Sequence, residues 1–252
     1  MGNRVALVTG VTRRQGIGAA IACALARAGA DVAAAYYRPY DRAMPWGVRD
    51  PEPAEIVAEL RATGVQAHGF EIDLAQPEGP STLFRLAREQ FGHIDILVNN
   101  AAYSTETTVE GMAAEALDRH YAVNLRAVML LCAEFVRALP AGCAGRIINL
   151  TSGQGLGPMP NELAYAATKG GIDAFTLSLS AAVAGRGITV NAVDPGPTDT
   201  GWMSAGLRDS LLATTSGGRL GTPADAARLV AFLASEEAAW VTGQVIRSRG
   251  AG

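Results

Sequence analysis

The sequence is poor in the side chains that build metal centres, disulfide frameworks and nucleic-acid surfaces. It has three histidines (His68, His93 and His120), which we expect at the surface, and three cysteines, and neither set has metal-ligand spacing. We therefore expect no metal site. So few cysteines, odd in number, predict a reducing, cytoplasmic setting. The formal net charge of −3 lacks the basic excess of proteins that bind a phosphate backbone, which argues against a nucleic-acid partner.

Long hydrophobic runs are missing as well. The most apolar stretches, 19–37 and 127–139, are both interrupted by charged residues, so neither qualifies as a membrane span. The first residues have no signal-peptide pattern, and Ala6 stands where an N-myristoylation signal requires Ser or Thr. We expect neither a targeting segment nor a membrane partner.

The chain of 252 residues, 49% hydrophobic and 18% charged, is long enough to bury a full core without disulfides or a structural metal. Short β-branched runs alternate with Ala/Leu-rich helical periods. The predicted strands cover 4–9, 31–37, 66–72, 94–98, 146–150, 188–193 and 244–247. The predicted helices cover 17–28, 53–63, 81–91, 112–138, 164–184 and 223–235. This alternation predicts an α/β fold: a three-layer, doubly wound, Rossmann-type parallel sheet of about seven strands, as one domain over 1–252.

Two irregular segments, 38–53 and 194–221, interrupt the alternation. Each follows a strand at the carboxyl edge of the predicted sheet, where ligands bind in this architecture. Long loops in compact domains are usually functional, so we expect binding loops here.

A glycine-rich turn, Thr9-Gly10-Val11-Thr12-Arg13-Arg14-Gln15-Gly16-Ile17-Gly18, joins the first predicted strand to the first helix. Glycines at such a turn let the backbone approach a pyrophosphate, whose charge the N–H groups of the helix start stabilise. The turn predicts a dinucleotide site, against the alternative of ordinary turn and cap glycines.

Tyr165 and Lys169 lie four residues apart on a predicted helix, so the phenol and the ammonium share one face. A neighbouring cation favours the phenolate, which suits a general acid/base for interconverting a carbonyl and an alcohol. Lys169 is the only lysine, against 20 arginines, which makes its place beside a tyrosine informative.

Several further signatures occur in order along the chain. They are Asp73 after the third strand, Asn99-Asn100-Ala101-Ala102 after the fourth, Asn124, Ser152, Tyr165 with Lys169, Pro195-Gly196 and Thr242-Gly243-Gln244. With the glycine-rich turn, they make the chain resemble the short-chain dehydrogenase/reductase family over nearly its whole length. Within the family, the resemblance is to 3-oxoacyl-[acyl-carrier-protein] reductases.

The resemblance implies roles for individual residues. Tyr165 would be the catalytic acid/base, Ser152 would orient the substrate carbonyl, and Lys169 would lower the pKa of the phenol and hold the nicotinamide ribose. Asn124 would anchor a proton-relay water. Asp73 would contact the adenine and Asn99 the adenosine ribose, while Thr198 and Thr200 would lie near the carboxamide.

The expected cofactor is NADP(H). The second strand ends in Tyr36-Tyr37-Arg38 without the carboxylate that an NAD preference usually requires, and arginines suit a phosphate dianion. The predicted cofactor residues are Gly10, Arg13, Arg14, Gly16, Ile17, Gly18, Arg38, Asp73, Leu74, Asn99, Ala101, Tyr165, Lys169, Pro195, Gly196, Thr198 and Thr200.

The chain also departs from the family pattern. Five residues rather than three separate Gly10 from Gly16, which resembles the enoyl-reductase branch, although that branch spaces its tyrosine and lysine more widely. The segment 247–250, Arg-Ser-Arg-Gly, replaces an acidic-Gly-Gly ending. An enoyl reductase and a catalytically silent nicotinamide-binding regulator remain the alternatives.

The resemblance leaves the substrate open among a 3-oxoacyl thioester, a polyketide, a sugar and a steroid-like ketone. Candidate residues for an apolar pocket wall are Leu156, Met159, Trp202, Met203 and Leu207. Wide apolar faces on helices 112–138 and 164–184 favour a homotetramer, or a dimer.

Overall fold

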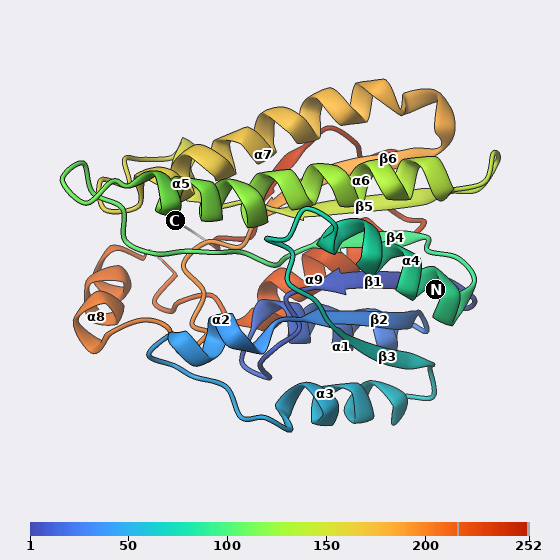
Figure 1. Ribbon diagram of the computed structural model, residues 1–252, viewed down its shortest axis with the longest axis horizontal. Helices are drawn as coiled ribbons and strands as arrows, with labels where there is room; N and C mark the ends of the chain where they lie inside the picture. The colour runs from blue at the N-terminus through green and yellow to red at the C-terminus, as the bar shows by residue number, and fades with distance from the viewer. Residues whose placement is uncertain (216, 251–252) are drawn as a thin grey trace.

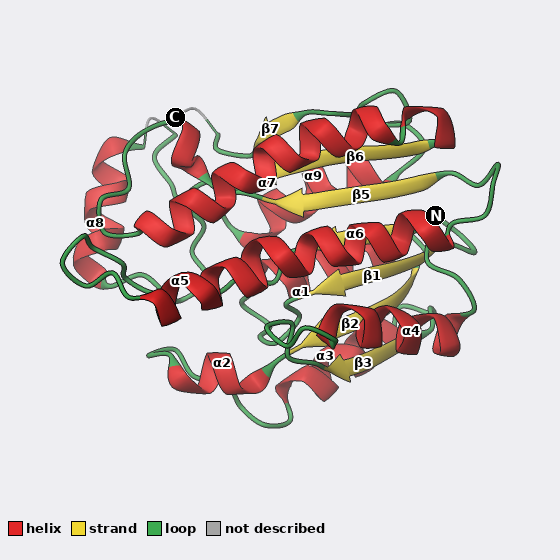
Figure 2. Cartoon of the chain, turned by 45° about the horizontal axis from the view of Figure 1, so that its top comes forward, coloured by secondary structure: helices red, strands yellow, loops and turns green. Residues whose placement is uncertain are grey.

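The computed structural model describes residues 1–215 and 217–250, and in it seven parallel strands form one sheet in the order β3-β2-β1-β4-β5-β6-β7 (Figure 2). The strands are β1 (Val5–Thr9), β2 (Asp31–Tyr36), β3 (Ala67–Glu71), β4 (Ile96–Asn99), β5 (Gly145–Leu150), β6 (Ile188–Asp194) and β7 (Val245–Arg247). The predicted fold class and all seven strands are confirmed, with ends shifted by up to two residues. The order reverses between β1 and β4, where a doubly wound sheet opens its ligand crevice.

Helices cover both faces of the sheet (Figure 1). They are α1 (Ile17–Arg27), α2 (Arg38–Ala43), α3 (Glu52–Arg61), α4 (Gly79–Phe91), α5 (Ala114–Tyr121), α6 (Ala127–Ala138), α7 (Leu163–Ala182), α8 (Ala205–Thr214) and α9 (Pro223–Ala234). A π-helical turn, Ala122–Arg126, joins α5 to α6, and 3₁₀ turns cover Gly153–Gly155 and Ala184–Arg186.

Two hydrophobic cores lie on opposite faces of the sheet because side chains alternate along each strand. From β1, Ala6 and Val8 face the core beneath α1, α3 and α9, whereas Leu7 faces the core beneath α4, α6 and α7. Val8 and Leu7 are fully buried. Burial on both faces explains why the strands read as continuous apolar runs.

Four predicted segments differ from the structure. The segment 38–53 contains α2, and 194–221 contains α8; both helices lie beyond the carboxyl ends of the strands (Figure 2). The expected helix 112–138 is divided by the π-helical turn, because periodicity alone does not reveal a single wider turn. The predicted helix 53–63 begins one residue earlier, since prolines are tolerated in a first helical turn.

No helix among the described residues is long and apolar enough to cross a membrane.

Candidate active site

The glycine-rich turn between β1 and α1 leaves no room for side chains at two positions. Gly10 has φ +77°, and a Cβ there would lie 2.6 Å from Nδ2 of Asn100. A Cβ on Gly18 would overlap the carbonyl oxygen of Gly10. α1 follows Gly16 without a side-chain cap or an acidic residue in its first turn. The N–H groups at this helix start therefore suit a bound phosphate.

A cavity of about 720 Å³ lies in front of this turn. Its wall contains six of the predicted cofactor residues: Gly10, Arg13, Gly16, Asp73, Leu74 and Ala101. Tyr36 and Tyr37 add aromatic surface from the end of β2. Burial raises the pKa of Tyr37, and the neighbouring carboxylate of Asp73 raises it further. The volume and the mixed polar and aromatic wall fit a nucleotide.

Two of the arginines expected near a cofactor phosphate lie outside this wall and are paired with carboxylates. Arg14 is paired with Glu55 of α3 at 3.0 Å. Arg38 donates from Nε to Oε1 of Glu71 at 2.9 Å, and its hydrogen bonding lowers the pKa of that carboxyl. Arg14 therefore points at α3, whereas Arg38, at the start of α2, points at Glu71 at the end of β3.

The third arginine ties the glycine-rich turn to α2. Arg13 donates from Nε to Oδ1 of Asp41 at 3.0 Å, and the indole of Trp46 donates to the same oxygen at 2.9 Å. The guanidinium lies 5.2 Å from the centre of the Trp46 ring and also donates to the carbonyl of Thr200 at 3.1 Å. Asp41 is buried, so its charge depends on these partners.

The opposite side of α2 is tied to the loop after β4. The hydroxyl of Tyr40 accepts from the N–H of Ser104 and donates to its carbonyl, both at 3.2 Å. Burial raises the pKa of Tyr40 to about 12. Tyr40 and Asp41 both line the cavity, so α2 spans the cavity mouth. Sequence reasoning missed these residues, although aromatic side chains in a proline-rich connection were a usable signal.

Ser152, Tyr165 and Lys169 meet at the carboxyl end of β5. Ser152 lies close enough to Tyr165 to lower the pKa of the phenol. Nζ of Lys169 lies 5.4 Å from the centre of the Tyr165 ring and donates to the carbonyl of Leu150 at 2.7 Å. Burial lowers the pKa of Lys169 to about 8. The structure thus brings together three of the four predicted catalytic side chains.

The pKa of Tyr165 departs from the expectation. Burial raises it above its ordinary value, and the hydrogen bond from Ser152 offsets this only in part. The charges of Glu162 and Asp194 raise it further. In this cleft, desolvation of the phenolate therefore outweighs the stabilisation expected from Lys169.

Asn124, the fourth predicted catalytic residue, lies in the π-helical turn and is fully buried. Its Oδ1 accepts from the N–H of Tyr103 at 2.7 Å, and its Nδ2 donates to the carbonyl of Tyr103 at 2.8 Å. Nδ2 also donates to Thr168 on α7 at 3.2 Å. Asn124 therefore connects the loop after β4 to the helix that carries Tyr165.

The predicted nicotinamide residues follow β6. Gly196 has φ +65°, and its N–H donates to Asp194 at 2.9 Å. The hydroxyl of Thr198 donates internally, to the carbonyls of Pro195 and Gly196, both at 3.1 Å. The Thr200 carbonyl accepts from Arg13 at 3.1 Å. Neither threonine hydroxyl nor Pro195-Gly196 lines the large cavity.

Two expectations about side chains need correction. Asn99 is buried and donates to Asn149 at 2.9 Å, so its side chain faces the sheet rather than the cavity. His120 is fully buried instead of exposed: Nδ1 bonds the Ala116 carbonyl at 2.7 Å, and Nε2 accepts from Thr105 at 3.3 Å. Both ring nitrogens are thus hydrogen-bonded to the backbone, so the buried ring has no unsatisfied polar atom.

The candidate residues for the apolar pocket wall form no closed pocket. Leu156, Trp202 and Leu207 are exposed, at 48%, 43% and 39%, and the large cavity does not include them. The Trp202 indole donates to the Thr198 carbonyl at 3.2 Å, which places its ring beside the predicted nicotinamide residues.

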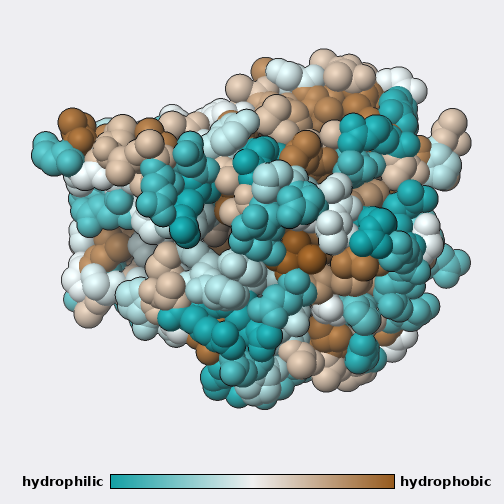
Figure 3. Space-filling view, in the orientation of Figure 1, coloured by the Kyte–Doolittle hydropathy of each residue, from teal (hydrophilic) through white to brown (hydrophobic). Residues whose placement is uncertain are grey.

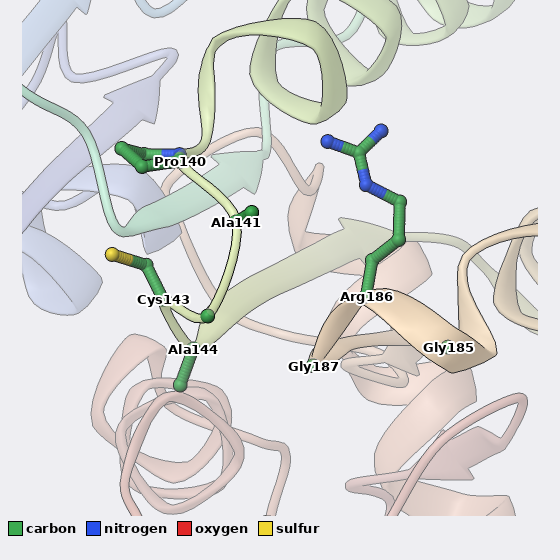
Figure 4. A pocket seen from close by; sticks show the side chains of 8 residues that line it. Pro140, Ala141, Cys143, Ala144, Gly185, Arg186 and Gly187 are labelled. Carbon is green, nitrogen blue, oxygen red and sulfur yellow. The ribbon is translucent and has the colours of Figure 1, made fainter.

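A second cavity of about 290 Å³ lies at the opposite edge of the sheet, between 140–144 and 185–187 (Figure 4). Its only charged lining residue is Arg186, whose guanidinium donates to the Val136 carbonyl at 2.6 Å. Cys143 lines it from the other loop. It brings together no acid/base or nucleophile pair, so the carboxyl edge remains the candidate site.

A parallel sheet with a phosphate-type turn after β1 and a serine–tyrosine–lysine cluster after β5 defines a class: a Rossmann-type, dinucleotide-dependent oxidoreductase. The family follows from comparison. A family model described as enoyl-(acyl carrier protein) reductase matches residues 10–250. An uncharacterized oxidoreductase of Bacillus subtilis, YjdA, is 45% identical over 249 residues, covering 98% of this chain and 96% of the relative. The chain belongs to the short-chain dehydrogenase/reductase family.

Two other relatives have more specific descriptions. The 3-oxoacyl-[acyl-carrier-protein] reductase FabG of Staphylococcus epidermidis is 35% identical over 251 residues, covering 98% of each chain. The crystal structure of angucycline C-6 ketoreductase LanV with bound NADP is 35% identical and superposes with a TM-score of 0.87, covering 99% of this chain and 95% of the other.

Proposed function

We propose that the protein transfers hydride between NADP(H) and a carbonyl/secondary-alcohol substrate. The observation that carries the proposal is the cluster of Ser152, Tyr165 and Lys169 at the same sheet edge as the phosphate-type turn. The turn fits the cofactor because it has no room for a Cβ at Gly10 or Gly18 and the helix that follows starts without a side-chain cap, which leaves its first N–H groups for a phosphate.

In the reductive direction, ketone, NADPH and one proton give alcohol and NADP⁺. NADPH, when bound, supplies the hydride for the carbonyl carbon. Ser152 donates a hydrogen bond to the carbonyl oxygen, and Tyr165 gives that oxygen its phenolic proton. Lys169 then stabilises the phenolate, since its ammonium is buried and close to the ring. Asn124 keeps the loop after β4 against α7, as its three hydrogen bonds indicate.

NADP(H) is the proposed cofactor rather than NAD(H). The support is that β2 ends at Tyr36 without a carboxylate at its tip, that Arg38 lies two residues further on, and that LanV was solved with NADP. Glu71 limits the free charge of Arg38 because the two are hydrogen-bonded. NADPH and NADH titrations followed by cofactor fluorescence test this, and equal affinities would contradict it.

The substrate class that we propose is a ketone, with 3-oxoacyl thioesters and polyketide-type ketones as the leading members. FabG is described as a 3-oxoacyl-[acyl-carrier-protein] reductase and LanV as an angucycline C-6 ketoreductase. The exposed side chains of Trp202 and Leu156 leave apolar surface on the loops after β5 and β6, which supports a bulky or extended substrate. Sugar and steroid-like ketones belong in the same panel.

An enoyl reductase is the second candidate, favoured by the description of the matching family model and by the lengthened glycine-rich turn. A catalytically silent regulator is the third. The proximity of Ser152 to Tyr165 argues for carbonyl chemistry, because two neighbouring hydroxyls suit the binding of one carbonyl oxygen. Matched ketone and conjugated enoyl thioesters separate the two enzymes, and cofactor binding without any turnover indicates the regulator.

The decisive experiment follows NADPH absorbance with the ketone panel in wild type and Tyr165→Phe. We expect a loss of at least 100-fold in kcat with NADPH affinity within twofold, because only the proton donor is removed. Equal turnover in both proteins would contradict the assignment of Tyr165.

We also propose a homotetramer, or a dimer, in a reducing cytoplasmic compartment. Exposed apolar side chains of α6, α7 and α9 and the loop after α9 support self-association: Met129, Leu130, Leu177, Phe232 and Trp240. Figure 3 shows apolar residues gathered over the second half of α7. All three cysteines are free. Light scattering at micromolar concentration tests the assembly, and a monomer would contradict it.

A further inference from the structure

The segment after β7 returns to the active site. Arg247 pairs with Asp194 in the sheet, and the N–H of Ser248 donates to the Asp194 carbonyl at 2.7 Å. The next residue, Arg249, donates from Nε to Oδ2 of Asp194 at 2.5 Å and from Nη2 to Oδ1 at 3.3 Å. The side chain of Asp194 is 2% exposed and that of Arg249 is 20% exposed, so the pair is shielded from water.

The Arg249 side chain lies in a slot between two glycines. A Cβ on Gly153, which follows Ser152, would overlap Nη2 of Arg249 and lie 2.9 Å from its Cζ. A Cβ on Gly196 would lie 2.7 Å from Cγ of Arg249. The Arg249 side chain therefore lies between two loops: its guanidinium is against the loop that carries Ser152, and its Cγ is against the loop predicted to meet the nicotinamide.

Four ionisable side chains gather where β5 and β6 end, and their formal charges cancel. Lys169 and Arg249 are the cations, and Asp173 and Asp194 are the anions. Asp173 accepts from Nε2 of Gln154 at 2.5 Å, and Lys169 lowers the pKa of this half-buried carboxyl, which burial raises. Loss of either cation leaves a net negative charge in a poorly solvated cluster.

That charge acts on Tyr165. Burial is the main cause of the raised pKa of Tyr165, which Ser152 lowers; Glu162, the phenol of Tyr40 and then Asp194 raise it further. Arg249 is the direct ion-pair partner of Asp194. Its guanidinium forms two hydrogen bonds with the carboxylate, a geometry that a lysine ammonium cannot reproduce.

We propose that Arg249 is a positioning residue of the active site: it fixes the Ser152–Gly153 and Gly196 backbones against each other and neutralises Asp194 behind Tyr165. This inference rests on the proposed carbonyl reduction for its kinetic consequence. Its structural part concerns only this chain's own residues.

The test compares Arg249→Gln, Asp194→Asn and the double variant with Arg247→Gln, which removes the same charge from an exposed position two residues away. The first readout is the ionisation of Tyr165, followed by ¹³C NMR with [ζ-¹³C]tyrosine and assigned with Tyr165→Phe. The others are the pH profile of alcohol oxidation, the KM for NADP⁺ and the melting temperature.

We expect Arg249→Gln to raise the apparent pKa of Tyr165 by about one pH unit, because an unpaired carboxylate disfavours the phenolate. The pH profile moves by the same amount, so the rate below the midpoint falls about tenfold while KM changes less than twofold. The double variant restores the wild-type midpoint, since it removes both charges. Arg247→Gln stays at wild type.

A second variant probes the slot without changing charge. Gly153→Ala places a methyl group on the guanidinium and is expected to shift Tyr165 in the same direction as Arg249→Gln. An unchanged Tyr165 titration in Arg249→Gln, or a double variant that remains shifted, would overturn the proposal and leave Arg249 as an anchor of the chain end. If the wild type reduces no carbonyl, the proposed function fails, but the NMR titration still decides this inference.

Discussion

Arg13 and Asp41 form an ion pair, with 3.0 Å between Nε and Oδ1, that joins the glycine-rich turn to α2 across the mouth of the cofactor cavity. Both side chains are largely buried, at 15% and 11% exposure. Trp46 shares the same carboxylate oxygen. The pair therefore holds α2 over the space in which the proposed cofactor binds.

Asp41→Ala is expected to loosen this closure. It leaves the Arg13 guanidinium and the Trp46 indole without their acceptor, which costs about 2 kcal/mol of unfolding free energy. We expect NADPH to bind several-fold more weakly, through faster dissociation. Stopped-flow fluorescence and urea unfolding measure the two effects. Asp50→Ala, which removes an exposed carboxylate from the same segment, is the control and should change neither.

The glycine-rich turn and the Tyr165–Lys169 pair could be predicted because their information is local. A turn without room for Cβ atoms requires glycine, and a four-residue step on a helix places two side chains together. The position of α2 beside the cavity could not be predicted. Pro39 is as compatible with a helix break as with a helix start, and Tyr40 and its partner Ser104 are far apart in the sequence. Asp194 and Arg249 lie 55 residues apart, so only the fold reveals their contact.

Gly18→Ala tests the role of the glycine-rich turn at the start of α1 in cofactor binding. The added methyl group would overlap the Gly10 carbonyl oxygen and lie 2.6 Å from Nδ2 of Asn100, so backbone must move. We expect at least tenfold weaker NADPH binding by fluorescence titration and a loss of about 1–3 kcal/mol in stability. Gly206→Ala in α8, where no atom lies within 4 Å of the new Cβ, is the matched control. Unchanged binding in Gly18→Ala would remove the phosphate role from this turn.

Lys169 makes stability depend on pH in the alkaline range. Its pKa is about 8 in the folded protein, against an ordinary value of 10.5, because it is buried. Between these values the unfolded chain holds a proton that the folded protein lacks, so folding stability rises with pH. From pH 8 to 10, wild type should gain about 2 kcal/mol relative to Lys169→Met in urea unfolding. The range ends at pH 10 because Tyr165, whose pKa is raised, acts in the opposite direction above it.

A constant stability difference between wild type and Lys169→Met over that range would mean that the ammonium is not desolvated as its burial indicates. Cysteines and the N-terminus titrate in both proteins, so their contributions cancel in the difference.

Asn124→Leu tests the hydrogen bonds by which Asn124 holds the loop after β4. The change keeps the side-chain volume but leaves the partly buried N–H and carbonyl of Tyr103 without their partners, which costs about 2 kcal/mol. We expect kcat to fall at least tenfold and NADPH to bind several-fold more weakly, since the loop after β4 is released from α7 and also lines the cofactor cavity. Thr168→Val, which removes a single hydrogen bond of Asn124, should show a small fraction of both losses. Equal losses in Asn124→Leu and Thr168→Val would contradict the expectation that the bonds from Asn124 to Tyr103 matter more than its bond to Thr168.

Cofactor preference should respond in opposite directions to the two members of one ion pair. Arg38 follows β2 and is hydrogen-bonded to Glu71 on β3, so the carboxylate competes with a 2′-phosphate for the guanidinium. Glu71→Gln removes the competing charge and is expected to raise the NADPH-to-NADH affinity ratio about threefold to tenfold, and Arg38→Gln to lower it by a similar factor. Because NADH lacks the phosphate, its own affinity should stay nearly constant in both variants. If the affinity ratio changes in the same direction in both variants, or changes only because NADH affinity changes, Arg38 does not face the phosphate. Arg13 would then be the next candidate for the origin of any preference.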